Sequence, residues 1–420
     1  MANADTSNFL VSESELIISE SRKQKAEQLK SRGDPLQLAG KALAIEVVGN
    51  AVWVADNTTV VRKIDLESGN TLQIYRGHRG PVSALALFKT TPNDGSEPRH
   101  ILITGSWDKT IKLWDADTKE IISSTEAHSD FVKSLLIFPS LNLLVSGSSD
   151  KIVRFWYHLF LYDSCVYQAL NHARSSRDLS SALDGEPLRS AGSITAHTRP
   201  VECLDGQDLA NGGAELCTGD TMGLIKLWTL TKDAGSPPRW TGTLKSEFNY
   251  HRTKISDLHY GNGQLWSAST DETVQIRTLS PALDHQKPPP PITHPVGVRC
   301  ILPLSLTALA ESYLLTGAGD VLRVYDMSSL IEPELLNEFD AHWHDITAIR
   351  LWVRKGEKDG KTTIEPWIIT TSLDATIRKW RLQDLLTQRM TKPTPPPATK
   401  GGFAMTAEEE EELAELLDSD

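Results

Sequence analysis

A short motif recurs seven times along this 420-residue chain. Each copy has an apolar stretch, then Gly or Ser with an Asp in most copies, and then a second apolar stretch that usually ends in an aromatic residue. The last residues of the copies are Ile64, Trp114, Trp156, Trp228, Arg277, Tyr325 and Trp380. A repeat of this size indicates one modular architecture, not a set of unrelated domains.

The residues within the copies alternate with the two-residue period of a β-strand, as in Ile111-Lys112-Leu113 and Val153-Arg154-Phe155. Each copy holds three such segments separated by turn residues, and a fourth follows in most copies. A four-stranded unit cannot bury both of its faces alone, whereas radial stacking around an axis buries them and leaves only short edges. We therefore predict an all-β fold, a single seven-bladed β-propeller over residues 35–385.

From about residue 36 to 385 the chain resembles the WD40-repeat family. In that family a His before the first strand, a Ser or Thr, an Asp in a tight turn and a strand Trp form a hydrogen-bonded tetrad. The resemblance implies three complete tetrads: His78, Ser106, Asp108 and Trp114; His128, Ser148, Asp150 and Trp156; and His342, Ser372, Asp374 and Trp380. A His/Asp/Ser set can resemble a catalytic triad, but a set that repeats from blade to blade indicates scaffold hydrogen bonding.

Four copies depart from this pattern. Arg277 stands at the Trp position of the fifth copy, and Tyr325 at that of the sixth. The turn of the fourth copy contains Asp220 and Met222, which leaves its tetrad open, and the first copy lacks the signature almost entirely. The chain just before the first copy, residues 35–38, is the expected outer strand of the last blade, and its pairing there would lock the ring.

The resemblance also implies a binding face, because propellers of this family mostly recognise peptides or proteins near the His-bearing loops. The residues implied to lie there are Arg79, Trp107, Phe131, Arg199, Trp343, His344 and Leu373. Exposed Trp and Arg side chains are the types that dominate interface energies. The alternative is that Trp107 and Trp343, on the blades flanking the first, only pack against neighbouring loops.

Residues 157–177 interrupt the repeat between Trp156 and Trp228. Their removal joins Trp156 to Asp178, which restores the family's Trp-Asp pair and a normal repeat length. One hypothesis is that these residues are an unspliced intron of 63 nucleotides, three for each of the 21 residues. The alternative is a genuine loop between blades that serves as a binding element, and sequencing the mature transcript decides between the two.

Both ends of the chain extend beyond the predicted propeller. Residues 1–34 are expected to be an extension, either a short helix or a disordered segment, and residues 386–402 a Pro-rich linker. In residues 403–420, acids in the first turn favour a helix, with Leu413, Leu416 and Leu417 on one face. This segment is either a helical ligand for a groove or a solvated acidic tail.

The charge of the chain excludes some classes of function. The net charge is −12, and eight acids without a base follow Lys400, so we expect no strong binding to duplex nucleic acid. The four Cys residues form no CxxC pair, no apolar stretch is long enough to cross a membrane, and no common enzyme motif is present. We therefore expect no catalytic residue, no cofactor, no metal and no membrane contact, and a protein of the cytoplasm, the nucleus or both.

These observations favour a non-enzymatic scaffold for protein–protein interaction, with the acidic C-terminal helix as a second contact. The alternative is an adaptor that recruits substrates to a ubiquitin ligase or to another modifying complex. The partners are expected to be proteins or peptides, and the oligomeric state is left open. An enzyme with its site in the central channel has no supporting motif.

Overall fold

The computed structural model describes residues 13–89, 99–157, 187–195, 197–210, 212–235, 239–279, 288–358 and 361–387. The chain divides into two compact units, Met1–Gln388 and Arg389–Asp420. All described residues belong to the first unit. The predicted C-terminal helix with Leu413, Leu416 and Leu417 and nearly all of the linker 386–402 lie outside the described residues.

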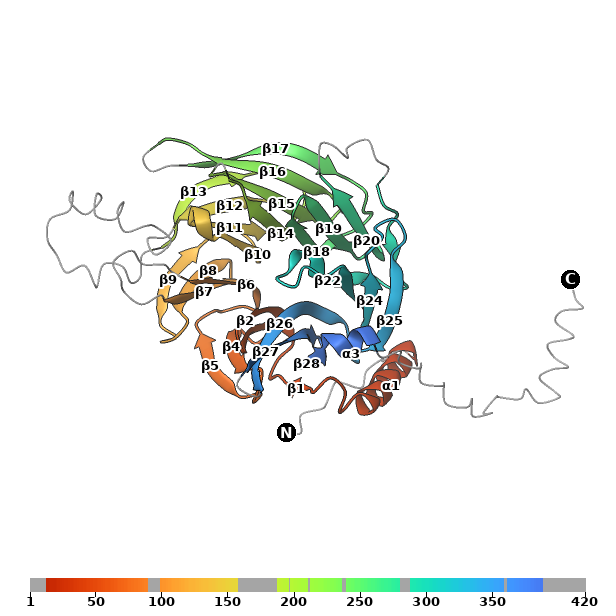
Figure 1. Ribbon diagram of the computed structural model, residues 1–420. Helices are drawn as coiled ribbons and strands as arrows, with labels where there is room; N and C mark the ends of the chain where they lie inside the picture. The colour runs from red at the N-terminus through yellow and green to blue at the C-terminus, as the bar shows by residue number, and fades with distance from the viewer. Residues whose placement is uncertain are drawn as a thin grey trace, which may run out of the picture. The chain divides into compact units, whose positions relative to one another are not determined.

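The first unit is a seven-bladed β-propeller, as the repeat predicted (Figure 1). It contains seven antiparallel four-stranded sheets, each of which is one blade. The inner strand of each blade packs against the inner strands of its neighbours, so these strands line the axis of the ring. The repeated apolar stretches form strands because their alternating side chains can pack on both neighbouring blades.

The strands take four positions from the axis outward, here given from blade 1 to blade 7. The inner strands are β2 (Ala42–Val48), β6 (Val82–Lys89), β10 (Val132–Phe138), β14 (Val201–Asp208), β18 (Ile255–Gly261), β22 (Val298–Pro303) and β26 (Ile346–Lys358). The second strands are β3 (Ala51–Asp56), β7 (His100–Ser106), β11 (Leu143–Ser148), β15 (Ala214–Asp220), β19 (Gln264–Ser269), β23 (Tyr313–Ala318) and β27 (Lys361–Ser372). The third strands are β4 (Val60–Asp65), β8 (Thr110–Asp115), β12 (Val153–Tyr157), β16 (Ile225–Lys232), β20 (Thr273–Thr278), β24 (Val321–Asp326) and β28 (Thr376–Arg381). The outer strands are β5 (Thr71–Arg76), β9 (Ile121–Glu126), β13 (Arg189–Ile194), β17 (Trp240–Phe248), β21 (Ile292–Thr293), β25 (Glu334–Asp340) and β1 (Leu36–Gln37).

The two ends of the propeller sequence meet in blade 7. Strand β1 pairs with β28 in the register Leu36↔Ile377 and Gln37↔Thr376. The amide of Leu38 also donates to the carbonyl of Ala375 at 2.8 Å. The expected closure of the ring by residues 35–38 is therefore confirmed.

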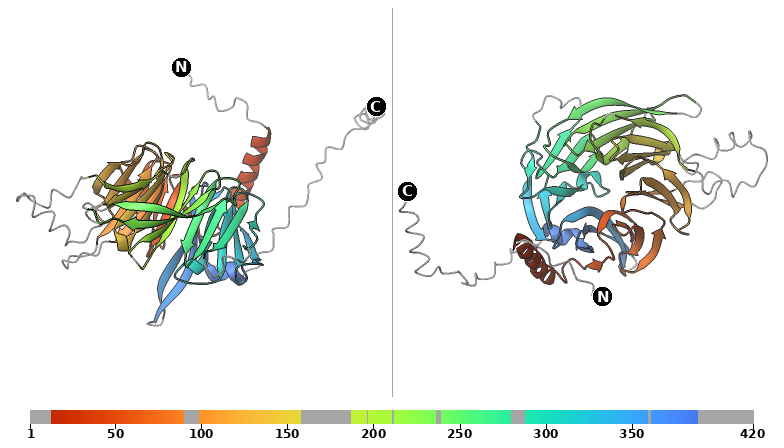
Figure 2. Two further views of the ribbon diagram at one scale, coloured as in Figure 1. Left: turned by 90° about the horizontal axis from the view of Figure 1, so that it is seen from above. Right: turned by 180° about the vertical axis from the view of Figure 1, so that it is seen from behind.

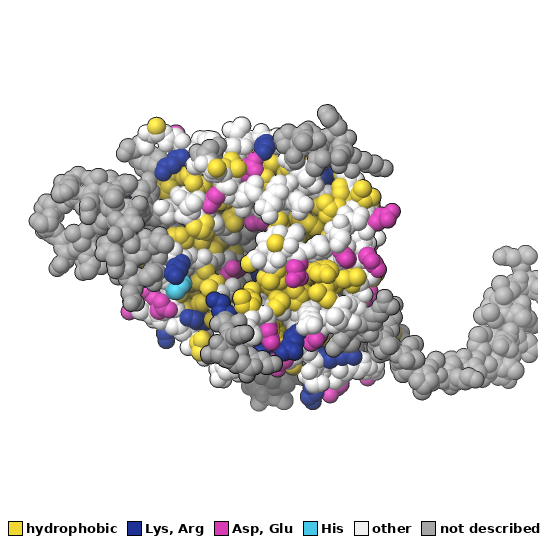
Figure 3. Space-filling model, viewed as in Figure 1, with side chains coloured by type: hydrophobic (Ala, Val, Ile, Leu, Met, Phe, Trp, Pro, Cys, Tyr) yellow, Lys and Arg dark blue, Asp and Glu magenta, His cyan; other side chains and the backbone are white. Residues whose placement is uncertain are grey.

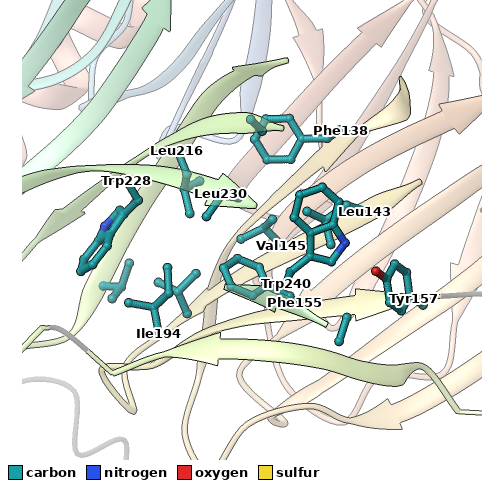
Figure 4. Close-up of a cluster of buried hydrophobic side chains, with 14 residues drawn as sticks. Phe138, Leu143, Val145, Phe155, Tyr157, Ile194, Leu216, Trp228, Leu230 and Trp240 are labelled. Carbon is teal, nitrogen blue, oxygen red and sulfur yellow. The ribbon is translucent and has the colours of Figure 1, made fainter. Parts of the chain in front are cut away.

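The core consists of apolar layers between neighbouring blades. One such layer, between blades 3 and 4, contains Phe155, Trp228 and Trp240, each almost completely buried (Figure 4). Gly192 in β13 makes this layer possible, because a side chain at its positive φ of 140° would collide with the carbonyl of Trp240. Tyr157, the first residue of the anomalous insert, ends β12 and packs in the same layer.

Residues 158–186, which include all of the insert except Tyr157, lie outside the described residues. They connect β12 and β13 of blade 3, so the insert falls within one blade and not between two blades as expected. Insertions at such a connection are tolerated because they leave the strand pairing intact.

The β26–β27 hairpin extends well beyond the other blades (Figure 2). Short helical segments are η2 (Pro139–Leu141), η5 (Leu304–Leu306) and α3 (Leu382–Thr387), which continues the chain after β28 and ends two residues beyond the predicted boundary at 385.

The N-terminal extension forms helix α1 (Glu13–Gln28), which projects from one face of the propeller (Figure 2). The base of the helix is fixed, because Leu29 is buried and the guanidinium of Arg378 donates to the carbonyls of Leu29 and Arg32 at 2.6 and 2.5 Å. Higher on the helix, the ammonium of Lys25 pairs with Asp320 and Asp340 of blade 6 at 2.7 and 2.5 Å. Of the two expectations for this extension, the helix is the one observed for the described residues.

Candidate interaction face

The loops that carry the His residues and the turns that carry the Asp residues lie on one face of the propeller. In an antiparallel sheet the connections alternate between the two ends of the strands. The loop that enters each inner strand and the turn between the second and third strands therefore share one end. We call this end the His–Asp face, and helix α1 stands on it because Lys25 contacts the turn of blade 6.

Blade 2 shows how a tetrad is built. The Nδ1 of His78 lies 2.9 Å from Oδ2 of Asp108, and its Nε2 lies 2.7 Å from Oγ1 of Thr104. The indole of Trp114 donates to the same Thr104 oxygen at 2.9 Å. These contacts make a continuous relay when the indole donates to the hydroxyl, the hydroxyl to Nε2, and the Nδ1 proton to the carboxylate.

The hydroxyl in this relay corrects the sequence prediction, which assigned it to Ser106. Both side chains point to the same side of β7, because residues two apart share a face of a strand. Ser106 is at the end of the strand, where it donates to the carbonyl of Gly80 and accepts from the amide of Asp108. Only Thr104 is deep enough to reach both the imidazole and the indole.

The same correction holds in two other predicted tetrads. In blade 3 the bridging hydroxyl belongs to Ser146, while Ser148 supports the turn. In blade 7 it belongs to Thr370, while Ser372 supports the turn. The remaining predicted members contact one another: His128 with Asp150, and His342 with Asp374, each at 2.9 Å; and Trp156 and Trp380 donate to the bridging hydroxyls. A constant spacing of ten residues between the hydroxyl and the Trp is the sequence signal that identifies these positions.

Blade 4 contains a fourth complete tetrad, which the sequence left open. His197 contacts Asp220 at 3.3 Å and Thr218 at 2.6 Å, and Trp228 donates to Thr218 at 3.1 Å. Asp220 lies at the end of β15, only two residues after Thr218, whereas Asp108 of blade 2 lies four residues after Thr104. The Asp220 carboxylate still contacts the imidazole. It also accepts from the amides of Met222 and Leu224, so one carboxylate both holds the His and closes the turn.

Blades 5 and 6 replace the indole in different ways. In blade 5, Tyr250 supplies a hydroxyl 3.2 Å from the bridging Ser267, and Arg277 at the Trp position lies over the Tyr250 ring. In blade 6, Tyr325 reaches Nε2 of His294 at 3.3 Å. The turn of blade 6 is one residue shorter, and its Asp320 pairs with Lys25 of α1 in place of the imidazole. Among the described residues, Nδ1 of His294 has no hydrogen-bond partner.

The protonation states follow from burial and hydrogen bonding. Burial raises the pKa of Asp108, but hydrogen bonds from His78, Thr110 and the Arg79 amide outweigh this effect and hold the pKa well below its usual range. Burial lowers the pKa of His128 and His342, so both imidazoles are neutral at pH 7. In blades 3 and 7 the tetrads are therefore neutral His donors on carboxylate acceptors, buried within the blades.

The exposed aromatic residues of the His–Asp face form a pair at blades 2 and 3. Trp107 and Phe131 are 38% and 36% exposed, and their rings stack at 5.1 Å with 17° between the planes. The Lys133 ammonium lies 5.7 Å from the Trp107 ring centre. Trp107 thus leans toward blade 3, and the contact with Phe131 joins two of the predicted face residues.

The other predicted face residues lie at separate positions. Arg79 and Arg199 are exposed on the loops of blades 2 and 4. Trp343, His344 and Leu373 are only half-buried in blade 7. Beside them, Arg22 of α1 is near enough to contribute, after burial, to lowering the pKa of His344. The helix therefore borders the blade 7 part of the face, which the sequence did not predict.

Within the described residues, no group of His, Cys, Asp or Glu side chains is arranged to hold a metal ion. Likewise, no described helix has the length and apolar character needed to span a bilayer. The described cysteines, Cys203, Cys217 and Cys300, are free thiols, and burial raises the pKa of each.

Comparison with known proteins agrees with this geometry. The family model "WD domain, G-beta repeat" matches residues 69–115 and 119–157, which cover blade 2, the last outer strand of blade 1 and most of blade 3 before the insert. Together with the seven blades and their His–Asp tetrads, this match decides the family. The chain is a WD40-repeat protein.

Sequence matches between this WD40 protein and its relatives cover different shares of its length. An uncharacterized WD repeat-containing protein of Schizosaccharomyces pombe is 28% identical over 373 residues, 87% of this chain and 84% of the relative. Mitochondrial division protein 1 of the same yeast is 32% identical over 32% of this chain and 18% of its own. The nuclear distribution protein PAC1 of Arthroderma otae is 25% identical over 49% of this chain and 41% of its own. In a crystal structure of the computationally designed protein Ika8, the matching fold has a TM-score of 0.53 and 19% identity, covering 81% of this chain and 83% of that one.

Proposed function

We propose that this WD40 protein is a non-enzymatic scaffold that holds a protein or peptide partner on its His–Asp face. The observation that carries the proposal is the Trp107–Phe131 pair, two large aromatic side chains left more than one-third exposed on a face that is otherwise tightly hydrogen-bonded. Aromatic side chains in this state are typical anchors of interfaces, because a partner that covers them removes a large apolar area from water.

The tetrads support this proposal by keeping the face rigid. Each tetrad ties an entry loop to the turn next to it, so the side chains presented from these loops need little ordering when a partner binds. Less ordering means a smaller entropic cost of association. The acidic C-terminal segment 403–420 is proposed as a second contact, and cytoplasm and nucleus are the compartments in which we expect the complex.

The test is affinity purification of the tagged chain from its own organism, followed by quantitative mass spectrometry. The purifications compare the wild type, Trp107→Ala, a chain without residues 403–420, and Lys119→Glu as a control on the opposite face. A stoichiometric partner that is lost with Trp107→Ala and kept with Lys119→Glu supports the His–Asp face. A partner that is lost only with the tail places the binding in residues 403–420, and the absence of any stoichiometric partner contradicts the scaffold.

A further inference from the structure

Basic side chains concentrate on the His–Asp face over blades 2 to 5. The loops, turns and strand starts at this end of the four blades carry seven bases: Arg79, Lys109, Lys133, Lys151, Arg199, Arg252 and Lys254. The same segments carry three carboxylates outside the tetrads: Asp130, Glu202 and Glu272. The four ionised tetrad carboxylates of these blades balance the difference in formal charge, but they are buried or half-buried, whereas five of the seven bases are exposed. We call the seven bases and the Trp107–Phe131 pair the basic arc.

Contacts within the basic arc leave most of its bases without a carboxylate. Glu202 is shared by Lys133 at 3.8 Å and Lys254 at 2.8 Å. Asp130 accepts the amide of Phe131. Within the part of the chain that the structure describes, the other five bases of the arc form no ion pair, and all five are exposed.

The Asp residues of the tetrads are ionised, but within the described residues none of them forms an ion pair with the seven bases. Asp108 accepts from His78, from Thr110 and from the Arg79 amide, so its lone pairs are directed into the blade. Asp271 in blade 5 is held in the same way by His251 and the Arg252 amide. Arg79 and Arg252, which directly follow His78 and His251, are consequently free to bind an external carboxylate, for which the planar guanidinium is well shaped.

We propose that the basic arc binds an acidic peptide segment of a partner protein, with a large apolar side chain of that segment on the Trp107–Phe131 pair. This inference rests on the proposed function and names the chemistry of the partner. Carboxylates of the segment pair with Arg79, Arg199 and the neighbouring Lys residues, and complementary charge of this kind raises the association rate. The apolar side chain supplies the burial that holds the complex together.

The geometry favours a peptide over a single-stranded nucleic acid. Proteins that bind single strands stack bases on open aromatic faces. Here the two rings are stacked on each other at 5.1 Å, which leaves no gap for a base between them. Their remaining exposed surface suits an aliphatic or aromatic side chain of a peptide.

The experiment measures fluorescence anisotropy of labelled peptides with the purified full chain at low and physiological salt. The first probe is a short Glu-rich peptide with a central Phe, and the second replaces Phe by Ser. We expect the first to bind more tightly, and both to weaken as salt increases. Arg79→Glu and Arg199→Glu should each weaken both probes by about fivefold or more, while Trp107→Ala should weaken only the Phe probe. Lys119→Glu, a charge reversal on the opposite face, should change neither, and melting curves of all variants check that they fold.

Several results overturn the proposal. The proposal is wrong if neither acidic probe binds. It is also wrong if Lys119→Glu and Arg79→Glu lower the affinity for the probes equally. If an oligouridine probe binds more tightly than the acidic peptides and displaces them, the basic arc is a nucleic-acid site. If Arg79→Glu removes the partner found by affinity purification but no acidic probe binds, the interaction face stands and the acidic chemistry fails. If neither effect occurs, both proposals fail.

Discussion

Replacing Thr104 by Val tests the corrected tetrad. The change keeps the β-branched shape but removes the hydroxyl that contacts Nε2 of His78 at 2.7 Å and the indole of Trp114 at 2.9 Å. Thr104 is completely buried, so water cannot replace either hydrogen bond. A buried polar group that loses its partner costs about 1–3 kcal/mol. With two such groups left, the free energy of unfolding should fall by roughly 2–6 kcal/mol.

The assay is thermal unfolding, followed by circular dichroism or by differential scanning fluorimetry. For a propeller of this size the unfolding entropy per residue translates that loss into a decrease in Tm of about 3–8 °C. The matched control is Thr71→Val, the same chemical change at an exposed position of β5, which should stay within about 0.5 kcal/mol of the wild type. Ser106→Ala is the competing variant, and it should cost about 1 kcal/mol because it removes one hydrogen bond to the Gly80 carbonyl of the entry loop and one from the Asp108 amide of the turn.

The order of the three variants decides the assignment. If Thr104→Val has the same Tm as Thr71→Val, while the Tm of Ser106→Ala is several degrees lower, then Ser106 supplies the bridging hydroxyl and the relay described above is wrong. If all three melt together, the tetrad contributes nothing to the stability of blade 2.

Three further predictions concern other parts of the molecule. Lys25→Met removes both ion pairs of α1 with blade 6, so hydrogen exchange should accelerate in α1 and stay unchanged in the propeller; equal exchange in α1 would show that the ion pairs do not hold the helix. Burial lowers the pKa of His294 from 6.5 to about 4, so between these values the unfolded chain binds a proton that the folded chain does not. The contribution of neutral His294 to the free energy of unfolding should therefore be fully present above about pH 6.5 and fall by up to about 3 kcal/mol as the pH decreases to about 4. His294→Phe should flatten this part of a plot of Tm against pH, and an unchanged plot refutes the assignment. Trp107→Ala should leave Tm nearly unchanged, whereas Asp108→Ala should lower the stability of blade 2 by roughly 1–3 kcal/mol; an equal loss in both would place Trp107 in the core.

The seven-bladed architecture could be predicted from sequence because the repeat is local. Each copy carries its own alternation and its own turn residues, so the strands and their number follow from short-range pattern. The closure of the ring was also predictable, since the last copy lacks an outer strand and the residues before the first copy supply one.

The bridging hydroxyls were assigned two residues too late for a physical reason. Ser106 and Thr104 lie on the same face of β7, and the pattern of alternation does not distinguish them. What separates them is depth in the blade, which depends on where His78 and Trp114 meet. That meeting point is a contact between segments far apart in sequence.

The strands, their order along the chain and the loops that carry the His and Asp residues depend on neighbouring residues, so they could be predicted from the sequence. Other features arise only in the folded chain: Trp107 stacks on Phe131, and Lys25 forms an ion pair with the turn carboxylate of blade 6. The arrangement of the bases of four blades in one arc is a further example. These features join residues of different blades, or a helix and a blade 295 residues away. Their partners are chosen by the closure of the ring and not by local pattern.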